Sequence, residues 1–375
     1  MNRKELAFRL KAARETVGLS LVEAAKRLGY PNYQTLSNIE NGQREIKVSE
    51  LANFARIYFC NLSDFLTAQS PRKEYAILWR NPPGDDALKK QTEREIFSLC
   101  EQYHMMEKLL GIKSGKGFME VTRESVKTGH AINLLAKDTA TMMGLGQRPS
   151  CALHKVLEQE YGVKILYYPL AYGSAASMVH DDMGKAVVIN SNEVPWRQNY
   201  DLAHELFHLI LWKVFTLEEM QDKLFFSDIE RKADSFASML LLPEDEIFRE
   251  IDQIMENDKQ LTYSDIVDVA IDFGVSAKAL LYRLAFINFI EWEQANTLAK
   301  DEDLAEISRQ KRTENLEPRR SDRFISLAVR CLRKGLISRG KFADLLKIDR
   351  SDIDDYIEGR GMMEAEGKTV EVMAS

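Results

Sequence analysis

The sequence has few of the features that mark exported, membrane-spanning or disulfide-bonded proteins. Only four of its 375 residues are cysteine (Cys60, Cys100, Cys151 and Cys331), and none forms a CxxC pair. Such isolated cysteines argue against a disulfide scaffold or a zinc ribbon and are typical of a reducing cytoplasm. No apolar run approaches the ~18 residues that a membrane span needs. The charged start of the chain also lacks the apolar core of a signal peptide. We therefore expect a cytoplasmic protein with no membrane partner.

The chain is acidic overall, but its charge is unevenly distributed. Residues 1–70 contain 10 Lys/Arg and 7 Asp/Glu, so their net charge is +3. The net charge of the whole chain is −7, so the remaining residues carry −10. Nucleic acid would repel the acidic remainder of the chain, but it would not repel the first 70 residues, which carry a small positive charge. Apolar residues (45%) and charged residues (29%) occur in the proportions of a globular protein.

Hydrophobic periodicity predicts a multidomain, mainly α-helical chain. The predicted parts are an all-α domain at residues 1–70, a helical connector at 71–130, an α+β domain at 131–295 and a small helical unit at 321–360. The first domain reads as five short helices, the last of them at residues 62–68. Strands are expected at 164–170 and 185–191, which are rich in β-branched and aromatic residues. The charged segment 296–320 reads as loop.

The motif His204-Glu205-Leu206-Phe207-His208 is the strongest chemical signal in the chain. Two histidines four residues apart project from the same face of a helix and can bind one Zn²⁺. Glu205 would act as general base on a metal-bound water. The surrounding segment AHELFHLILW is apolar, so these polar side chains need a partner that a metal would provide. The alternative is a pair of core histidines satisfied by backbone carbonyls.

A catalytic zinc needs a third protein ligand, and Glu230 is the best candidate for it. It follows His208 by 22 residues, far enough to return on a second helix. Asp234 lies one turn later on the same face, where its carboxylate would hold a ligand histidine in place without binding the metal itself. The rival carboxylates are Glu218, Glu219 and Asp228, whose contexts are less apolar. A solvated charged helix face is the alternative interpretation of this segment.

Two further features near the motif have a functional interpretation and a structural one. His180 precedes a candidate strand. Its functional interpretation is a contact to a transition-state oxyanion, and its structural interpretation is a surface histidine. The strand at 185–191 would bind a substrate as an added strand at a sheet edge, or it is a core strand.

Residues 20–42 have the pattern of a helix-turn-helix, with Ser20 and Glu23 forming a capping box. The second helix would enter the major groove of double-stranded DNA. Its exposed residues and one basic residue after it are the candidates for contacts to bases and phosphates. They are Tyr33, Gln34, Thr35, Ser37 and Asn38 on the helix, and Arg44 after it. Leu36 and Ile39 face inward. The alternative is a protein-binding helical bundle.

These residues resemble the Xre/phage-repressor family of helix-turn-helix domains, over residues 1–70. Leu21 stands where many members have a glutamine that contacts phosphate. The turn around Pro31 is one residue longer than in the phage repressors.

Residues 131–290 resemble the ImmA/IrrE family of zinc metallopeptidases, in RQNYDLAHELFH, ERKADSFASMLLLP and VSAKALLYRL. The resemblance implies a zincin-like α+β domain in which His204, His208 and Glu230 bind Zn²⁺ and Glu205 is catalytic. Phe207 replaces a glycine common in the family. The segment 321–346 is similar to C-terminal extensions found with such peptidases.

The two resemblances together predict a DNA-binding transcriptional regulator with a zinc-dependent endopeptidase domain. Its partners would be operator DNA and a protein substrate, either a partner repressor or antitoxin, or the chain itself. The alternative is a repressor or antitoxin whose peptidase-like domain binds metal or a partner without hydrolysis. A homodimer is expected because such domains usually read paired half-sites. The segment 337–357 could be a second helix-turn-helix. Its acidic residues Asp349, Asp352, Asp354 and Asp355 would repel phosphate and favour a structural or protein-contact role.

Overall fold

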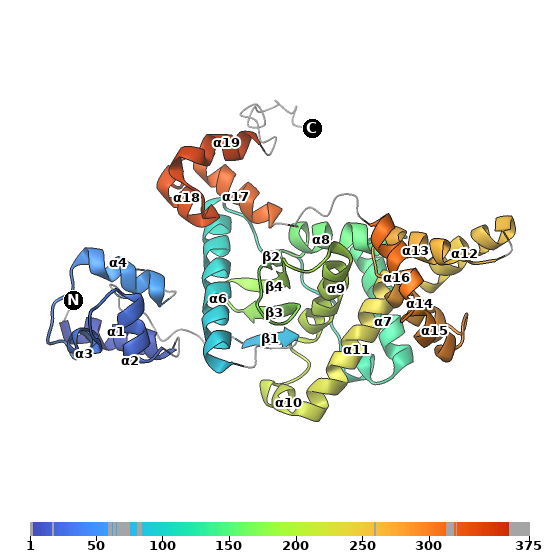
Figure 1. Cartoon of the computed structure of the whole chain (residues 1–375), viewed down its shortest axis with the longest axis horizontal. Helices are drawn as coiled ribbons and strands as arrows, with labels where there is room; N and C mark the ends of the chain where they lie inside the picture. The colour runs from blue at the N-terminus through green and yellow to red at the C-terminus, as the bar shows by residue number, and fades with distance from the viewer. Residues whose placement is uncertain are drawn as a thin grey trace. The chain divides into compact units, whose positions relative to one another are not determined.

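The computed structural model describes residues 3–16, 19–58, 76–80, 85–258, 260–312 and 321–359, together with Leu62, Phe65 and Arg319. The chain is mainly helical, with helical parts at each end and a small sheet in the middle (Figure 1). This confirms the predicted fold class. No helix in these residues is both long and apolar enough to cross a membrane.

The N-terminal domain consists of four described helices around a small apolar core. They are α1 (Arg3–Thr16), α2 (Leu21–Arg27), α3 (Tyr33–Glu40) and α4 (Val48–Ile57). Ser20 caps α2 through the predicted box with Glu23, and Asn32 caps α3 by accepting from the Thr35 amide. Leu36 and Ile39 are buried, as expected. The fifth helix predicted at 62–68 lies outside the described residues except for Leu62 and Phe65.

The central domain contains a four-stranded sheet in the order β1-β3-β4-β2. The strands are β1 (Ala76–Arg80), β2 (Lys164–Tyr168), β3 (Ala175–His180) and β4 (Gly184–Asn190). β1 pairs antiparallel with β3, β3 antiparallel with β4, and β4 parallel with β2. The two predicted strands correspond to β2 and β4. β4 lies inside the sheet, so its suggested role as a substrate-binding edge is wrong and the core-strand interpretation is right.

The other two strands, β1 and β3, were not predicted. The sequence of β3, AASMVH, is rich in small residues and lacks a run of β-branched ones. β1 is five residues long and belongs to the segment expected to be a helical connector. That segment also contains α6 (Asp86–Leu109) and a 3₁₀ turn at Arg123–Val126. Part of the expected connector is therefore part of the sheet.

Helices cover both faces of the sheet (Figure 1). The first half of α6 lies on one face, where the Trp79 indole of β1 donates to Glu93 at 2.8 Å. The long helix α9 (Pro195–Leu211) packs on the other face against β3 and β4. Pro195 is the first residue of α9. The first N–H groups of a helix have no carbonyl partner within it, so proline, which lacks an N–H, costs no hydrogen bond there.

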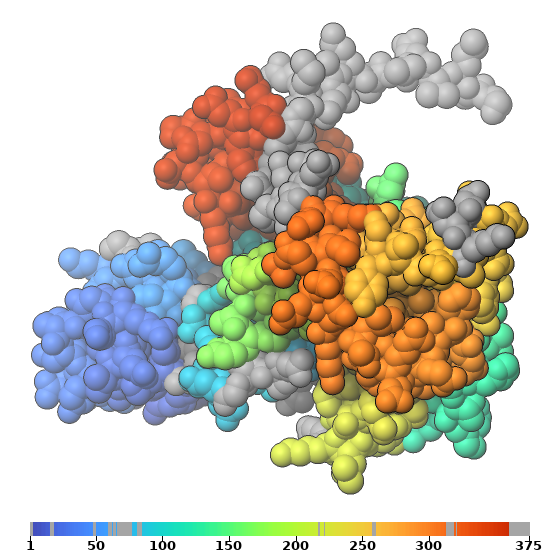
Figure 2. All heavy atoms as spheres, turned by 45° about the vertical axis from the view of Figure 1, so that its right-hand side comes forward, coloured from blue at the N-terminus to red at the C-terminus, as the bar shows by residue number. Residues whose placement is uncertain are grey.

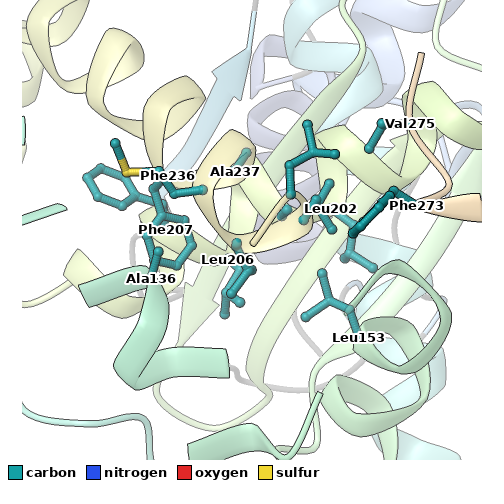
Figure 3. Packing of buried hydrophobic residues seen from close by; sticks show 14 of the residues in the cluster. Ala136, Leu153, Leu202, Leu206, Phe207, Phe236, Ala237, Phe273 and Val275 are labelled. Carbon is teal, nitrogen blue, oxygen red and sulfur yellow. The ribbon is translucent and has the colours of Figure 1, made fainter. Parts of the chain in front are cut away.

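The core of the central domain lies between α9 and the helices α7 (Gly129–Met143), α8 (Pro149–Gln159) and α11 (Lys223–Leu241). Figure 3 shows Leu202, Leu206 and Phe207 of α9 directed into this core, with Phe236 and Ala237 of α11 facing them. The ring centroids of Phe207 and Phe236 are 5.3 Å apart. This packing fixes α11 against α9.

Six further helices complete the central domain. They are α10 (Leu217–Gln221), α12 (Glu244–Asp258), α13 (Tyr263–Asp272), α14 (Ala277–Phe286), α15 (Trp292–Leu298) and α16 (Glu302–Lys311). Figure 2 shows the later ones, in yellow and orange, as one continuous surface. The expectation of loop at 296–320 is wrong over α16. Asp301 caps this helix and Leu304 anchors it in the core, so its charged residues form a solvated face.

The C-terminal residues form a separate compact unit with the second half of α6, residues 99–113. The unit contains α17 (Asp322–Arg333), α18 (Arg339–Leu346), a 3₁₀ turn at Arg350–Asp352 and α19 (Ile353–Glu358). Phe324 of α17 packs on Tyr103 of α6, with ring centroids 5.5 Å apart. Arg323 reaches the Tyr103 hydroxyl at 3.0 Å and Glu107 at 2.8 Å.

Candidate functional site

Three side chains converge between α9 and α11. His204 and His208 lie one turn apart on α9, and their Nε2 atoms are 3.2 Å apart. Glu230 of α11 places Oε2 3.3 Å from Nε2 of His204 and Oε1 3.0 Å from Nε2 of His208. Tetrahedral bonds of about 2.0–2.1 Å to zinc would separate ligand atoms by about 3.3 Å. Two imidazoles and one carboxylate at this spacing suit a zinc ion that keeps one position open.

Without a metal, the three groups neutralise one another. Burial by itself would lower the pKa of His204, but hydrogen bonds with Asp234 and Glu230 outweigh it and raise that pKa to about 9. Burial would raise the pKa of Glu230, yet its bonds with the two histidines lower it to about 2. The metal-free cluster therefore holds a proton on imidazole nitrogen that a metal ion would have to displace.

Glu205 is buried beside the three donors, with the Ser177 hydroxyl as a polar neighbour. Its side chain projects from α9 into the interior, and the residue is 1% exposed. Within the described part of the chain, neither carboxylate oxygen accepts a hydrogen bond. Burial raises the pKa of Glu205, with His208 and His204 opposing this. A buried carboxyl that accepts no hydrogen bond is costly, and its place beside the three donors fits a site able to hold a metal ion.

A second layer of charges orients His204. Asp234 Oδ1 lies 2.9 Å from His204 Nδ1, as expected for a carboxylate that fixes the ring. Arg80 at the end of β1 donates to the same Asp234 oxygen at 2.7 Å and to Asp201 at 2.5 Å. Asp201 is fully buried one turn before His204 on α9, and this burial raises its pKa although Arg80 lowers it.

The other candidates for this site lie elsewhere. Glu219 pairs with Arg123, and Asp228 pairs with Lys232 on its own helix. Neither belongs to the group of donors able to hold a metal in the described residues, and Glu218 does not belong to it either. His180 accepts from the amides of the turn that follows β3 and packs edge-on to Phe97, so it is not an oxyanion contact here.

The predicted DNA-binding residues lie on or after α3 and differ in exposure. Tyr33, Gln34 and Asn38 are exposed, whereas Thr35 and Ser37 are half-buried. The Thr35 hydroxyl donates to Asn32 at 3.1 Å. Arg44 is engaged within the domain: it bonds Glu50 at 2.9 Å and lies over the Tyr30 ring at 5.4 Å. Exposed amide and phenol groups at the start of a helix suit base and phosphate contacts.

Comparison with protein families agrees with this division of the chain. Residues 5–63 match a family described as a helix-turn-helix domain. Residues 158–285, which contain the three converging side chains, match the M78 peptidase family, described as an IrrE N-terminal-like domain. The chain joins a helix-turn-helix domain to an IrrE-like domain.

Comparison with individual proteins adds little to the family match. A structure described as a Mycobacterium tuberculosis transcriptional regulator has 14% sequence identity and a TM-score of 0.31. The match covers 49% of this chain and 51% of that chain, so this chain spans about half the length of that regulator. No curated protein matches.

Sequence reasoning missed three residues that surround His204, His208 and Glu230 in the IrrE-like domain. Asp201 lies three positions before His204 and shares its helix face, so helical spacing could have identified it. Ser177 of β3 approaches Glu205 and lowers its pKa, but it lies in a strand that was not predicted. Arg80 is 121 residues from its partner Asp201, and no local pattern indicates their contact.

Proposed function

We propose that the chain is a DNA-binding regulator whose IrrE-like domain is a zinc-dependent endopeptidase. The observation that carries the proposal is the convergence of His204, His208 and Glu230 beside the buried carboxylate of Glu205, which accepts no hydrogen bond. The substrate we propose is a partner repressor or antitoxin, or the chain itself. The site of action that we propose is the cytoplasm.

The chain's own residues would divide the work of peptide hydrolysis. His204, His208 and Glu230 would hold the zinc ion, and Asp234 would keep the His204 ring in place. When bound, the ion supplies the Lewis acidity that amide hydrolysis requires. Glu205 would take the proton of the attacking water on a carboxylate oxygen and deliver it to the leaving amine nitrogen. Its raised pKa suits a group that both accepts and returns a proton.

The first test separates zinc binding from hydrolysis. Elemental analysis should find about one zinc in the wild type and none in Glu230→Ala, because two histidines hold zinc less well than three ligands. Glu205→Gln should keep the zinc but lose about 10²–10⁴-fold in cleavage of candidate repressors, as expected for removal of a general base. If the wild-type protein binds no zinc when zinc is supplied, the proposal of a zinc-dependent endopeptidase is refuted.

A second candidate is a repressor or antitoxin that binds metal or a partner without hydrolysis. The complete burial of Glu205 favours it, because a substrate must reach this carboxylate for hydrolysis. The two functions differ in the Glu205→Gln variant. Loss of regulation with DNA binding retained would support the peptidase, and unchanged regulation would support the binding module.

The proposed DNA interface can be tested without knowing the operator. Selection from random double-stranded DNA should enrich a sequence bound by the whole chain. Replacing Gln34 and Asn38 by alanine should reduce this binding by about 1–3 kcal/mol for each lost base contact. Glu45→Gln, at an exposed position after α3, provides a control that should not weaken binding.

A further inference from the structure

The strand β1 follows the helix-turn-helix domain in sequence but pairs with β3 beside the metal cluster. Only 12 residues separate the end of the matched helix-turn-helix segment, residue 63, from Ala76. β1 lies at the edge of the sheet, with β3 as its only neighbour among the described strands. It is the one strand of this sheet that lies outside the matched residues 158–285 of the IrrE-like domain.

The register of β1 directs alternate side chains toward the site. Leu78 is opposite Ser177, and directly opposed residues of antiparallel strands share a face of the sheet. That face carries Glu205, because the Ser177 hydroxyl approaches its carboxylate. Arg80, two residues further, lies on the same face and reaches Asp201 and Asp234. Trp79 faces the other way and bonds Glu93 of α6.

Removing β1 would convert β3 into an edge strand. The backbone N–H and C=O groups that now pair with β1 would then be free to pair with an extended peptide. A peptide bound there in the same direction as β1 would place one side chain at the position of Leu78, opposite Ser177. Its backbone would run past Glu205 and the three metal-binding side chains. β1 therefore occupies the path that an extended substrate would take.

We propose that β1 is an internal occupant of the peptide-binding edge of β3 and keeps the endopeptidase closed until it leaves. This inference rests on the proposed function and adds its regulation. The ligand of the opened edge is an extended peptide segment of a protein. The contacts of Arg80 with Asp201 and Asp234 hold the strand in place, and β1 is short enough to be displaced as a unit.

A reversible disulfide across the two strands tests this directly. Ala76 and Val179 are directly opposed, so cysteines at both positions can form a bridge within the usual Cα separation of about 4.4–6.8 Å. Cys60→Ser and Cys151→Ser remove competing thiols in the full-length protein. The matched control carries Ala76→Ser and Val179→Ser and cannot be locked. Zinc content is measured in every form.

Two readouts are taken in oxidised and reduced protein. The first is hydrolysis of unfolded casein. The second is fluorescence polarisation of a labelled peptide of residues 74–82, EYAILWRNP, with zinc-loaded protein that also carries Glu205→Gln. We expect the oxidised lock to retain zinc while both hydrolysis and peptide binding fall at least tenfold. Reduction should restore both, and the serine control should not respond to reduction.

The opposite change provides a test that needs no disulfide. Consecutive amides of a strand point to opposite sides, so Ile77→Pro with Leu78→Pro removes a pairing hydrogen bond whichever amide faces β3. This variant should cleave casein and bind the peptide at least tenfold better than wild type. Faster amide exchange in β3, with unchanged exchange in α9, would verify that only the strand pairing is lost.

The outcomes distinguish the proposed role of β1 from the proposed endopeptidase activity. Hydrolysis and peptide binding that are equal in locked and reduced protein would overturn the inference and leave the endopeptidase intact. Lock-sensitive peptide binding without hydrolysis in any zinc-loaded form would support the peptide-binding edge and refute the endopeptidase. Absence of both peptide binding and hydrolysis from the released forms would refute both.

Discussion

The helix-turn-helix domain and the IrrE-like domain both bury charged side chains, but they satisfy them differently. In the first, Arg14 of α1 and Glu40 of α3 form a closed pair. Nε and Nη2 of Arg14 donate to the two Glu40 oxygens at 2.8 and 2.9 Å, and Nη1 donates to the Leu19 carbonyl at 2.8 Å. Each carboxylate oxygen has a donor, so the pair needs nothing further and fixes α1 against α3.

In the IrrE-like domain the buried charges are left incomplete. Both oxygens of Glu205 lack a hydrogen bond, and the three neighbouring donors point at one another. A buried carboxylate that accepts no hydrogen bond is costly, and such a cost persists where the surrounding core imposes it. Satisfied buried charge therefore marks structure, whereas convergent unsatisfied charge marks a site for an absent group. The following predictions test this difference.

Breaking the closed pair should have the largest effect. Glu40→Ala leaves the Arg14 guanidinium buried without its carboxylate, which should lower the free energy of unfolding of the helix-turn-helix domain by about 3–5 kcal/mol. Hydrogen exchange of the α1 and α3 amides measures this loss. The double change Arg14→Met with Glu40→Leu is the control, because an apolar pair should restore most of the stability. A loss below about 1 kcal/mol would show that the pair is not a structural lock.

Removing the support of the open cluster should weaken metal binding. Asp234→Ala frees the His204 ring, and we expect about 10–100-fold lower zinc affinity in chelator competition. Asp228→Ala on the same helix is a matched control, since Asp228 pairs with Lys232 and Arg231 away from the cluster. Equal affinities in the two variants would mean that Asp234 does not orient the ligand.

Zinc affinity should also depend on pH in a defined direction. The pKa of His204 is raised to about 9 in the metal-free protein, so its imidazole is protonated at pH 7 and must lose that proton to bind zinc. Apparent affinity should therefore rise by up to about tenfold per pH unit between pH 7 and 9 and level off above it. Calorimetry in buffers of different ionisation enthalpy should detect about one proton released at pH 7. Affinity independent of pH over this range would contradict the raised pKa.

The smallest expected effect is a gain of stability from neutralising Glu205. In zinc-free protein, Glu205→Gln replaces a buried carboxyl that accepts no hydrogen bond by a neutral amide, which should raise the free energy of unfolding by about 1 kcal/mol. Thermal unfolding measures it. Glu219→Gln is the control, because Arg123 and the Thr216 cap satisfy that carboxylate and hold its pKa at about 2. Stabilisation by both variants would point to general charge effects, and destabilisation by Glu205→Gln would mean that Glu205 has a partner.

Local patterns in the sequence determined much of this protein. Capping residues and apolar spacing predicted the helices of the first domain, because both act within a few residues along the chain. The spacing of His204 and His208 follows from helix geometry alone. Glu230 and Asp234 could be selected because an apolar helix of suitable length carries them at one-turn spacing. Strands rich in β-branched residues, β2 and β4, were also identified.

The tertiary structure alone decided what lies next to the site. Arg80 meets Asp201 and Asp234 from positions 121 and 154 residues away, through sheet pairing that no local periodicity encodes. β4 lies inside the sheet because β3 pairs with it on the side away from β2, and the short sequence of β3 has a weak strand signal. The burial of Glu205 depends in turn on how that sheet packs against α9. Helix geometry relates residues one turn apart, so neighbouring residues in the sequence determine it. Strand order and burial depend on contacts between segments that are far apart in the sequence.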